Sequence, residues 1–353
     1  MSRARTWSYA NARMRANLGA IAGLSLYGEL ARLALDEAIK RLAATPPRGI
    51  EWPSIKDNQS EGIGALLYHA YENHLLKMAR LLPDPYRQVF ILALEHVAVD
   101  DIKHLIRRIL GGHQKRGHSR AHYLTIDRSA IVPDLTNVGS LDALDHCLAG
   151  TVFSEPYRLA RSNFVDTGEI LAFEVALDLD YHRRLNEAIH GLPETDAKAV
   201  GKLFRRQCDI KNLGWILRYR FDFELTEVEI FNYTLSIGYE LNDDLVMKLA
   251  GLHSSDHFLP AISHLPVGKF LNKVLPQGKV PVIEIEAALD KYWEKIHKDA
   301  FCGAPFGLLP FMAYQVLKEL ERTRLERIIV GLQLDLLPEE IVDSLWLDEG
   351  GNA

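Results

Sequence analysis

The residue types best suited to metal chemistry gather in one short basic segment. Histidines and cations alternate there, at His113, Lys115, Arg116, His118, Arg120 and His122. Zinc sites need converging ligands held by an ordered frame, whereas Gly111 and Gly112 before this segment predict a loop. A solvated loop, or a contact with acidic partner groups through Lys115, Arg116 and Arg120, fits better than a metal site. We therefore predict no metal ligands here.

Other side chains that could do acid–base chemistry are poorly placed for it. Glu319 and Glu321 are two residues apart, so they lie on different faces of a helix. His253 and His257 are four apart, but the Ser-Ser-Asp between them predicts a loop or a helix cap. The aromatic group Trp215, Tyr219 and Phe221 at a helix end is typical of a core rather than of a binding box, and we expect no catalytic residue.

Nucleotide and nucleic-acid binding are not indicated. The chain has no GxxxxGK[ST] phosphate loop, and its single GxG, Gly62-Ile-Gly64, lacks a third glycine and a preceding strand. The 353 residues contain 41 Lys and Arg against 47 Asp and Glu, a net charge of -6. A protein that holds nucleic acid through its overall charge would be basic. No cofactor is predicted.

The cysteine positions and the hydropathy pattern indicate in which cellular compartment the chain is expected. Cys147, Cys208 and Cys302 lie far apart and in no CxxC pattern, which favours a reducing cytoplasm over a disulfide framework. The most apolar stretch, residues 18–35, carries Glu29 and an arginine, which a membrane span tolerates poorly. That stretch follows an Arg-rich start but continues at helical spacing, so an amphipathic helix fits it better than a signal peptide does.

Helices must position these side chains. Apolar residues recur at spacings of three and four through 170–189, 203–217 and 308–330, and Pro and Gly clusters separate the stretches. Alternating patterns typical of strands are confined to Ala121–Ile126 and Val280–Ile283. The sequence predicts an all-α protein.

One helical motif occurs three times. An acid is followed by a leucine four residues on and by an apolar pair seven or eight on. The pairs of acid and leucine are Asp101 and Leu105, Asp209 and Leu213, and Glu321 and Leu325. The acids are 209 − 101 = 108 and 321 − 209 = 112 residues apart. We expect each leucine to be buried and each acid to form an ion pair with Lys103, Lys211 or another base.

Two further motifs recur in the same order along the chain. Glu174 and Asp178 match Glu286 and Asp290 at an offset of 112, and 31 residues separate each aspartate from the next motif acid. The third motif is an acid with leucine six residues on, at Asp36, Asp142 and Asp243. Three ordered motifs indicate a triplication.

The predicted repeats are residues 1–135, 136–237 and 238–353, with a loop-rich insertion at Ser254–Pro281 in the third. Three such units would pack as helical bundles in an approximately threefold funnel or socket. That shape suits a ring, a socket or an adaptor better than a cleft enzyme.

Several segments together resemble a known family. The quoted segments are Tyr9-Ala-Asn-Ala-Arg13-Met-Arg15, His74-Leu-Leu-Lys-Met-Ala-Arg80, Asp209-Ile-Lys-Asn-Leu213 and Lys318-Glu319-Leu-Glu321 leading into Leu325. In this order they resemble the C-type subunit of archaeal and bacterial A/V-type rotary ATPases, the counterpart of the d-type subunit in the eukaryotic vacuolar enzyme. The chain departs from the family pattern at His104 and Arg324, where the family usually has Asn, and at Glu326, which replaces an Arg.

The resemblance implies a non-catalytic rotor part. Members of the family are funnels of three helical units that sit on the membrane ring and hold the central stalk, built of D- and F-type subunits, in their cavity. The resemblance places such a chain at the cytoplasmic face of the membrane, with no span of its own and with ATP chemistry in other subunits. Two alternatives stay open: a free-standing helical adaptor unrelated to the ATPase, and a metal-dependent all-α hydrolase using the 113–122 loop.

Overall fold

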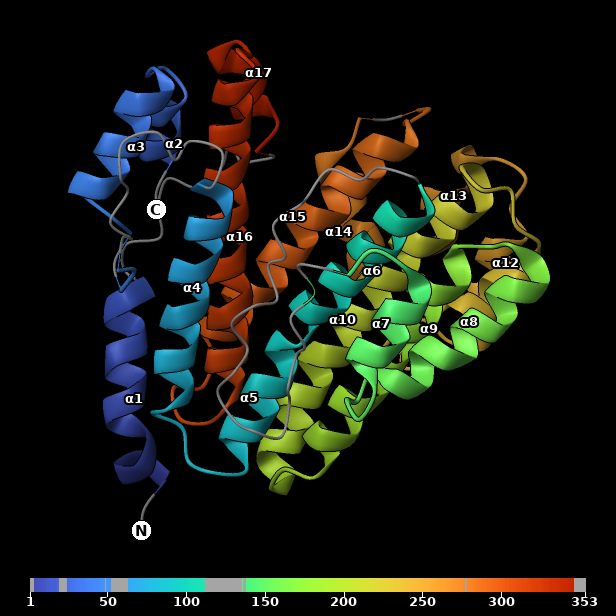
Figure 1. Cartoon of the computed structure of the whole chain (residues 1–353), viewed down its shortest axis with the longest axis horizontal. Helices are drawn as coiled ribbons and strands as arrows, with labels where there is room; N and C mark the ends of the chain where they lie inside the picture. The colour runs from blue at the N-terminus through green and yellow to red at the C-terminus, as the bar shows by residue number, and fades with distance from the viewer. Residues whose placement is uncertain are drawn as a thin grey trace. The chain divides into compact units, whose positions relative to one another are not determined.

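The computed structural model describes residues 3–18, 24–47, 49–51, 63–111, 135, 138–276 and 278–345 (Figure 1). Within these ranges all regular structure is helical, which confirms the all-α prediction. The candidate strand Val280–Ile283 is wrong, because Pro281 caps a helix that begins at Val282. Proline fits there since the first helical amides need no partner within the helix. The other candidate strand, Ala121–Ile126, lies outside the described residues.

The chain divides into two compact units, one of Met1–Arg41 with Pro193–Ala353 and one of Leu42–Leu192. The second unit contains α4 (Ile63–Ala79), α5 (Tyr86–Leu94), α6 (His96–Leu110), α7 (Leu141–Leu148), α8 (Ser154–Thr167) and α9 (Leu171–His190). Helix α9 packs on α5, α6 and α8. The rings of Tyr157 and Phe173, 5.4 Å apart, lie at the seam between α8 and α9. Burial of such rings supplies much of the stability of a helical unit.

The first unit is built on three long helices. Its elements are α1 (Arg3–Leu18), α2 (Leu24–Leu30), α10 (Glu194–Phe221), α11 (Glu227–Tyr233), α12 (Asp243–Ala250), α13 (Phe258–Ile262), α14 (Pro266–Val274), α15 (Val282–Phe301), α16 (Leu309–Gln333) and α17 (Pro338–Asp343), and α3 (Leu35–Ala44) spans the boundary with the other unit. Helix α15 packs against both α10 and α16. Leu213, Ile216 and Leu217 on α10 have no exposed surface. An apolar stripe of this kind drives the packing of a long helix.

Side-chain pairs set the directions of these helices. Arg218 near the end of α10 meets Glu286 near the start of α15, whereas Gln207 in the middle of α10 meets His297 near the end of α15. Helices α10 and α15 are therefore antiparallel.

Helix α16 also runs against α15. Arg324 hydrogen-bonds to Glu294 on α15. Arg327 lies one turn later on α16, and its charge acts to lower the pKa of Asp290, which lies one turn earlier on α15. Since α10 and α16 both oppose α15, their C-terminal ends point the same way, toward the start of α15.

The stretch expected to be a loop-rich insertion is mostly helical. A 3-10 turn at Ser255–His257, α13 and α14 occupy much of residues 254–281, and α14 packs on α15. At Gly268 the backbone of Ile262 approaches so closely that an added Cβ would lie 1.9 Å from its carbonyl oxygen. Only glycine permits this contact between α13 and α14. The proline and glycine pattern hid these helices because they are short and follow one another closely.

The three opening motifs take one common form. Asp36, Asp142 and Asp243 each lie in the first turn of a short helix, α3, α7 and α12. At that place a carboxylate stabilises the helix, because its negative charge interacts favourably with the unpaired N–H groups of the helix start. Leu42, Leu148 and Leu249, the leucines six residues on, are buried.

Candidate functional site: the groove between α10, α15 and α16

The repeated motif helices are α6, α10 and α16. Their leucines Leu105, Leu213 and Leu325 are buried as expected, and so are the acids Asp101, Asp209 and Glu321. A buried carboxylate is costly unless it is hydrogen-bonded or paired. For Asp209 and Glu321, the hydrogen-bond and ion-pair partners show what the acid does.

Asp209 caps a loop. Its carboxylate accepts hydrogen bonds from the backbone N–H groups of Tyr239, Glu240 and Leu241 at 2.9–3.3 Å. This loop leads from α11 into α12. The expected ion pair with Lys211 is wrong for this copy, because backbone amides some thirty residues away take the carboxylate.

Gly238 lets the loop approach this closely. A Cβ at this position would lie 2.3 Å from the carbonyl oxygen of Leu241 and 2.8 Å from Oδ1 of Asp209. Contacts of that length do not occur for real side chains, so the position requires glycine. Burial raises the pKa of Asp209 to about 6, against the opposing effect of the three backbone N–H groups.

Glu321 forms the expected ion pair with another base. Nζ of Lys318, one turn earlier on α16, lies 2.7 Å from its Oε2, and both side chains are 0% exposed. Burial first, then the charge of Glu321, raises the pKa values of Tyr27 and Tyr314, so both phenols stay protonated. The third motif acid is thus the centre of a buried polar cluster.

In the second unit, Glu174 and Asp178, the acids of the second sequence motif, join α9 to α6. Lys103 donates to both carboxylate oxygens of Asp178, at 2.9 and 3.0 Å, and Arg107 bonds Glu174. Lys103 also pairs with Asp100 on its own helix. Lys103 of α6 therefore pairs with an acid on α9 and with an acid on its own helix.

The first unit repeats this arrangement. Arg218 of α10 bonds Glu286 of α15, and burial raises the pKa of Asp290, with Arg327 opposing. The offsets are 286 − 174 = 112 and 218 − 107 = 111 residues. In α6 and in α10, an arginine of the motif helix therefore pairs with the first acid of the next long helix.

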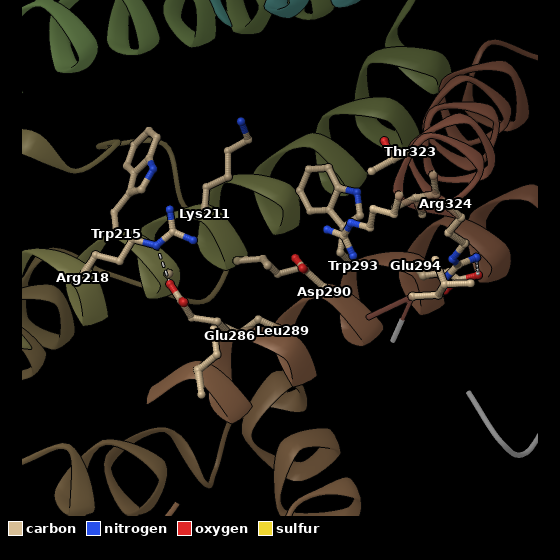
Figure 2. A pocket seen from close by; sticks show the side chains of 16 residues that line it. Lys211, Trp215, Arg218, Glu286, Leu289, Asp290, Trp293, Glu294, Thr323 and Arg324 are labelled. Carbon is tan, nitrogen blue, oxygen red and sulfur yellow. Dashed lines mark hydrogen bonds and ion pairs between the residues drawn. The ribbon is translucent and has the colours of Figure 1, made fainter. Parts of the chain in front are cut away.

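Between α10, α15 and α16 lies a groove with a volume of about 380 Å³ (Figure 2). Its lining from α10 is Ile210, Lys211, Gly214, Trp215 and Arg218; from α15, Ile283, Glu286, Leu289, Asp290, Trp293 and Glu294; and from α16 and beyond, Leu320, Thr323, Arg324, Arg327 and Leu345. Figure 2 shows Arg218 meeting Glu286 and Arg324 meeting Glu294 across the helix seams. Two ion pairs thus join the walls of the groove.

Arg324, at a position where the resemblance implies asparagine, joins α16 to α15. Both its terminal nitrogens bond the carboxylate of Glu294, one of them at 3.1 Å. A two-pronged arginine–carboxylate contact fixes geometry as well as charge. Arginine reaches across the seam here, which the shorter asparagine would not do.

The aromatic lining differs from the predicted aromatic core. Tyr219 is buried as expected, but Trp215 is half-buried and lines the groove, as Trp293 of α15 also does. Tryptophan and arginine side chains in a partly desolvated groove are the usual anchors of protein contacts. The lining suits the binding of another protein better than bond-making chemistry.

His297 of α15, one turn after the groove residue Trp293, is a neutral imidazole. Its Nδ1 is 2.6 Å from the carbonyl oxygen of Trp293, to which it donates, and its Nε2 accepts from the amide of Gln207 at 2.6 Å. Burial lowers the pKa of His297 to about 4. Between pH 6.5 and 4, His297 is protonated in the unfolded chain but stays neutral in the folded chain.

We expect acid to destabilise the protein through His297. Its contribution to the free energy of unfolding is full above pH 6.5 and falls by up to about 3 kcal/mol as the pH drops to 4. Asp209 acts oppositely, since its raised pKa adds stability as the pH falls through 6. His297→Gln should therefore change the pH profile of urea unfolding, losing less stability between pH 7 and 4.5 than the wild type. The exposed His264→Gln is the control, and parallel wild-type and His297→Gln profiles would contradict the assignment.

Some predicted contacts lie outside the described residues. These are Lys115, Arg116 and Arg120, together with the histidines of their segment. Within the described ranges no three His, Cys, Asp or Glu side chains gather as a metal site would require. The same ranges contain no helix long and apolar enough to cross a bilayer.

Comparison with known proteins gives one consistent result. A model of the family described as ATP synthase (C/AC39) subunit matches residues 10–343. The C subunit of the A-type ATP synthase of Methanosphaera stadtmanae is 22% identical over 348 residues, covering 97% of this chain and 88% of that protein. The C subunits of the same enzyme from Methanothermobacter thermautotrophicus and Methanosarcina mazei are 24% and 22% identical, covering 96% of this chain and 87% and 92% of theirs.

Proposed function

Because the chain belongs to the C/AC39 subunit family of ATP synthases, we propose that it is a rotor part without a catalytic site of its own, which couples a central stalk to a membrane-embedded ring. The match of residues 10–343 to the family carries this proposal. In this role the chain works at the cytoplasmic face of the membrane during ATP-driven ion transport or ATP synthesis. Its partners are the D- and F-type stalk subunits and the ring.

The state of the acidic residues supports a structural role. The carboxylate of Asp209 accepts hydrogen bonds from backbone amides. Glu321 forms an ion pair with Lys318, and Glu286 forms one with Arg218. A general acid or base must reach a substrate within hydrogen-bond distance. These carboxylates instead join elements of the fold, which suits a part that transmits torque.

Three helical repeats arranged as a socket remain part of the proposal, with bounds 1–135, 136–237 and 238–353. The equivalent short helices α3, α7 and α12 support it. So do the corresponding pairs Arg107–Glu174 and Arg218–Glu286.

We assign the groove between α10, α15 and α16 to a protein of the stalk. Trp215 and Trp293 would be its apolar anchors, and the arginines would fix orientation. The basic loop with Lys115, Arg116 and Arg120 stays a predicted second contact.

The test is co-purification of the tagged full chain from detergent-solubilised membranes of its host. We expect stalk and ring subunits to be retained with it, and the purified chain alone to bind no nucleotide. ATP turnover by the pure chain, or retention of neither stalk nor ring, would overturn the proposal. The second outcome would favour the free-standing adaptor, against which the family match now stands.

A further inference from the structure

Two exposed apolar turns follow the long helices α10 and α16. The first turn comprises residues 222–229 and the second residues 333–340, and together we call them the paired turns. Phe223 is 59% exposed in the first and Leu334 is 65% exposed in the second. Val228 and Leu337 accompany them, also well exposed. Large apolar side chains clustered at a surface mark contact sites.

The paired turns share an uncommon backbone conformation. Glu224 has φ 55° and Asp335 has φ 54°, the left-handed region that glycine usually occupies. They are 335 − 224 = 111 residues apart, the offset that also separates Phe223 from Leu334. Each costs about 1 kcal/mol relative to glycine. A cost retained at both equivalent places indicates that the side chains, and not only the turn, matter.

The following helices begin in the same way. Glu229 accepts from the backbone N–H of Thr226 at 2.8 Å, and Glu340 accepts from that of Leu337 at 2.9 Å. The next residue in each copy is a buried isoleucine, Ile230 or Ile341. The paired turns are therefore two copies of one local structure.

Both turns lie at one end of the three-helix layer. Helices α10 and α16 oppose α15, so their C-terminal ends lie where α15 begins. Ile283 at the start of α15 is 61% exposed there as well. Ile283 and Arg218, which lie near this end, are among the residues that line the groove.

The charge of the paired turns selects the partner. Residues 222–229 carry four acids and residues 333–340 carry three, and neither turn contains Lys or Arg. The acids are Asp222, Glu224, Glu227 and Glu229 in the first turn, and Asp335, Glu339 and Glu340 in the second. A second copy of this chain or an anionic lipid surface would be repelled. A protein that offers cations around apolar contacts is favoured.

We propose that the paired turns dock on a protein surface that repeats, each turn using the same contact on a different copy of one cationic, apolar loop. Two copies of one structure within a chain are matched by a partner that presents one surface more than once. Resting on the proposed function, that partner is the membrane ring of identical subunits rather than the stalk.

The test uses full-length chain carrying Phe223→Ser with Leu334→Ser. Binding is measured to the detergent-solubilised ring and, separately, to the stalk subunits. We expect ring binding about tenfold weaker or more, with stalk binding unchanged. Glu227→Lys with Glu339→Lys should weaken ring binding similarly, and wild-type ring binding should weaken with added salt. The control is Leu159→Ser with Val165→Ser, equally exposed residues of α8.

The outcomes separate the two proposals. Wild-type chain that binds neither ring nor stalk overturns the proposed function. Wild-type chain that binds both, with serine variants that keep their full affinity for the ring, overturns the docking inference alone. Serine variants that lose the stalk but keep the ring overturn the choice of partner. Binding to phosphatidylglycerol vesicles that the serine variants lose would assign the turns to lipid and also overturn it.

Discussion

Lys318→Met is expected to lower the free energy of unfolding by about 3–5 kcal/mol, because it leaves the charge of Glu321 buried without its cation. Both side chains are fully buried, with Nζ and Oε2 2.7 Å apart. Solvent cannot replace the lost interaction at this depth. Urea unfolding followed by circular dichroism at pH 7 measures the loss.

The double variant Lys318→Met with Glu321→Leu is the decisive control. Replacing both partners by apolar groups of similar size removes the charge as well as the pair, so most of the lost stability should return. Lys198→Met, which removes the exposed partner of Glu194 on α10, should leave the unfolding midpoint nearly unchanged. A double variant as unstable as Lys318→Met would show that the cost is one of packing and not of charge.

Asp209→Ala is expected to lower the free energy of unfolding by about 2–4 kcal/mol, because three backbone N–H groups lose their acceptor. The loss should begin locally, since these groups belong to the loop of Tyr239, Glu240 and Leu241 that leads into α12. Hydrogen exchange followed by mass spectrometry should show faster exchange across that loop, and urea unfolding gives the total.

Asp166→Ala, at an exposed acid of α8, is the matched control and should alter neither measurement. Unchanged exchange in the 239–241 loop of Asp209→Ala would contradict the capping role. Loss of global stability alone, with the loop still protected, would do so too.

The sequence predicted those features that depend on periodicity. Helical spacing gave the all-α class, and the buried Leu105, Leu213 and Leu325 follow from the same pattern. The pair of Lys318 with Glu321 was within reach, since a base three residues before an acid shares its helix face.

Contacts between distant segments were beyond that reasoning. Asp209 bonds amides thirty residues later, and the pairing of Lys103 with Asp178 spans 75 residues. A local pattern favours the nearest base, so it named Lys211 in error as the partner of Asp209. Only the packing of one helix on another decides which charges meet.

The paired turns were missed for a different reason. A left-handed backbone conformation is usually predicted from a glycine in the sequence, but here Glu224 and Asp335 adopt it. The acids therefore looked like ordinary surface charge. Comparing φ values across the 111-residue offset is what reveals them.

The pairs across the helix seams also limit how this protein can deform. A slip of α16 along α15 by one helical turn would move Arg324 about 5.4 Å from Glu294 and break both hydrogen bonds at once. Arg218 and Glu286 impose the same register on α10. The three helices therefore resist axial sliding as one stiff unit.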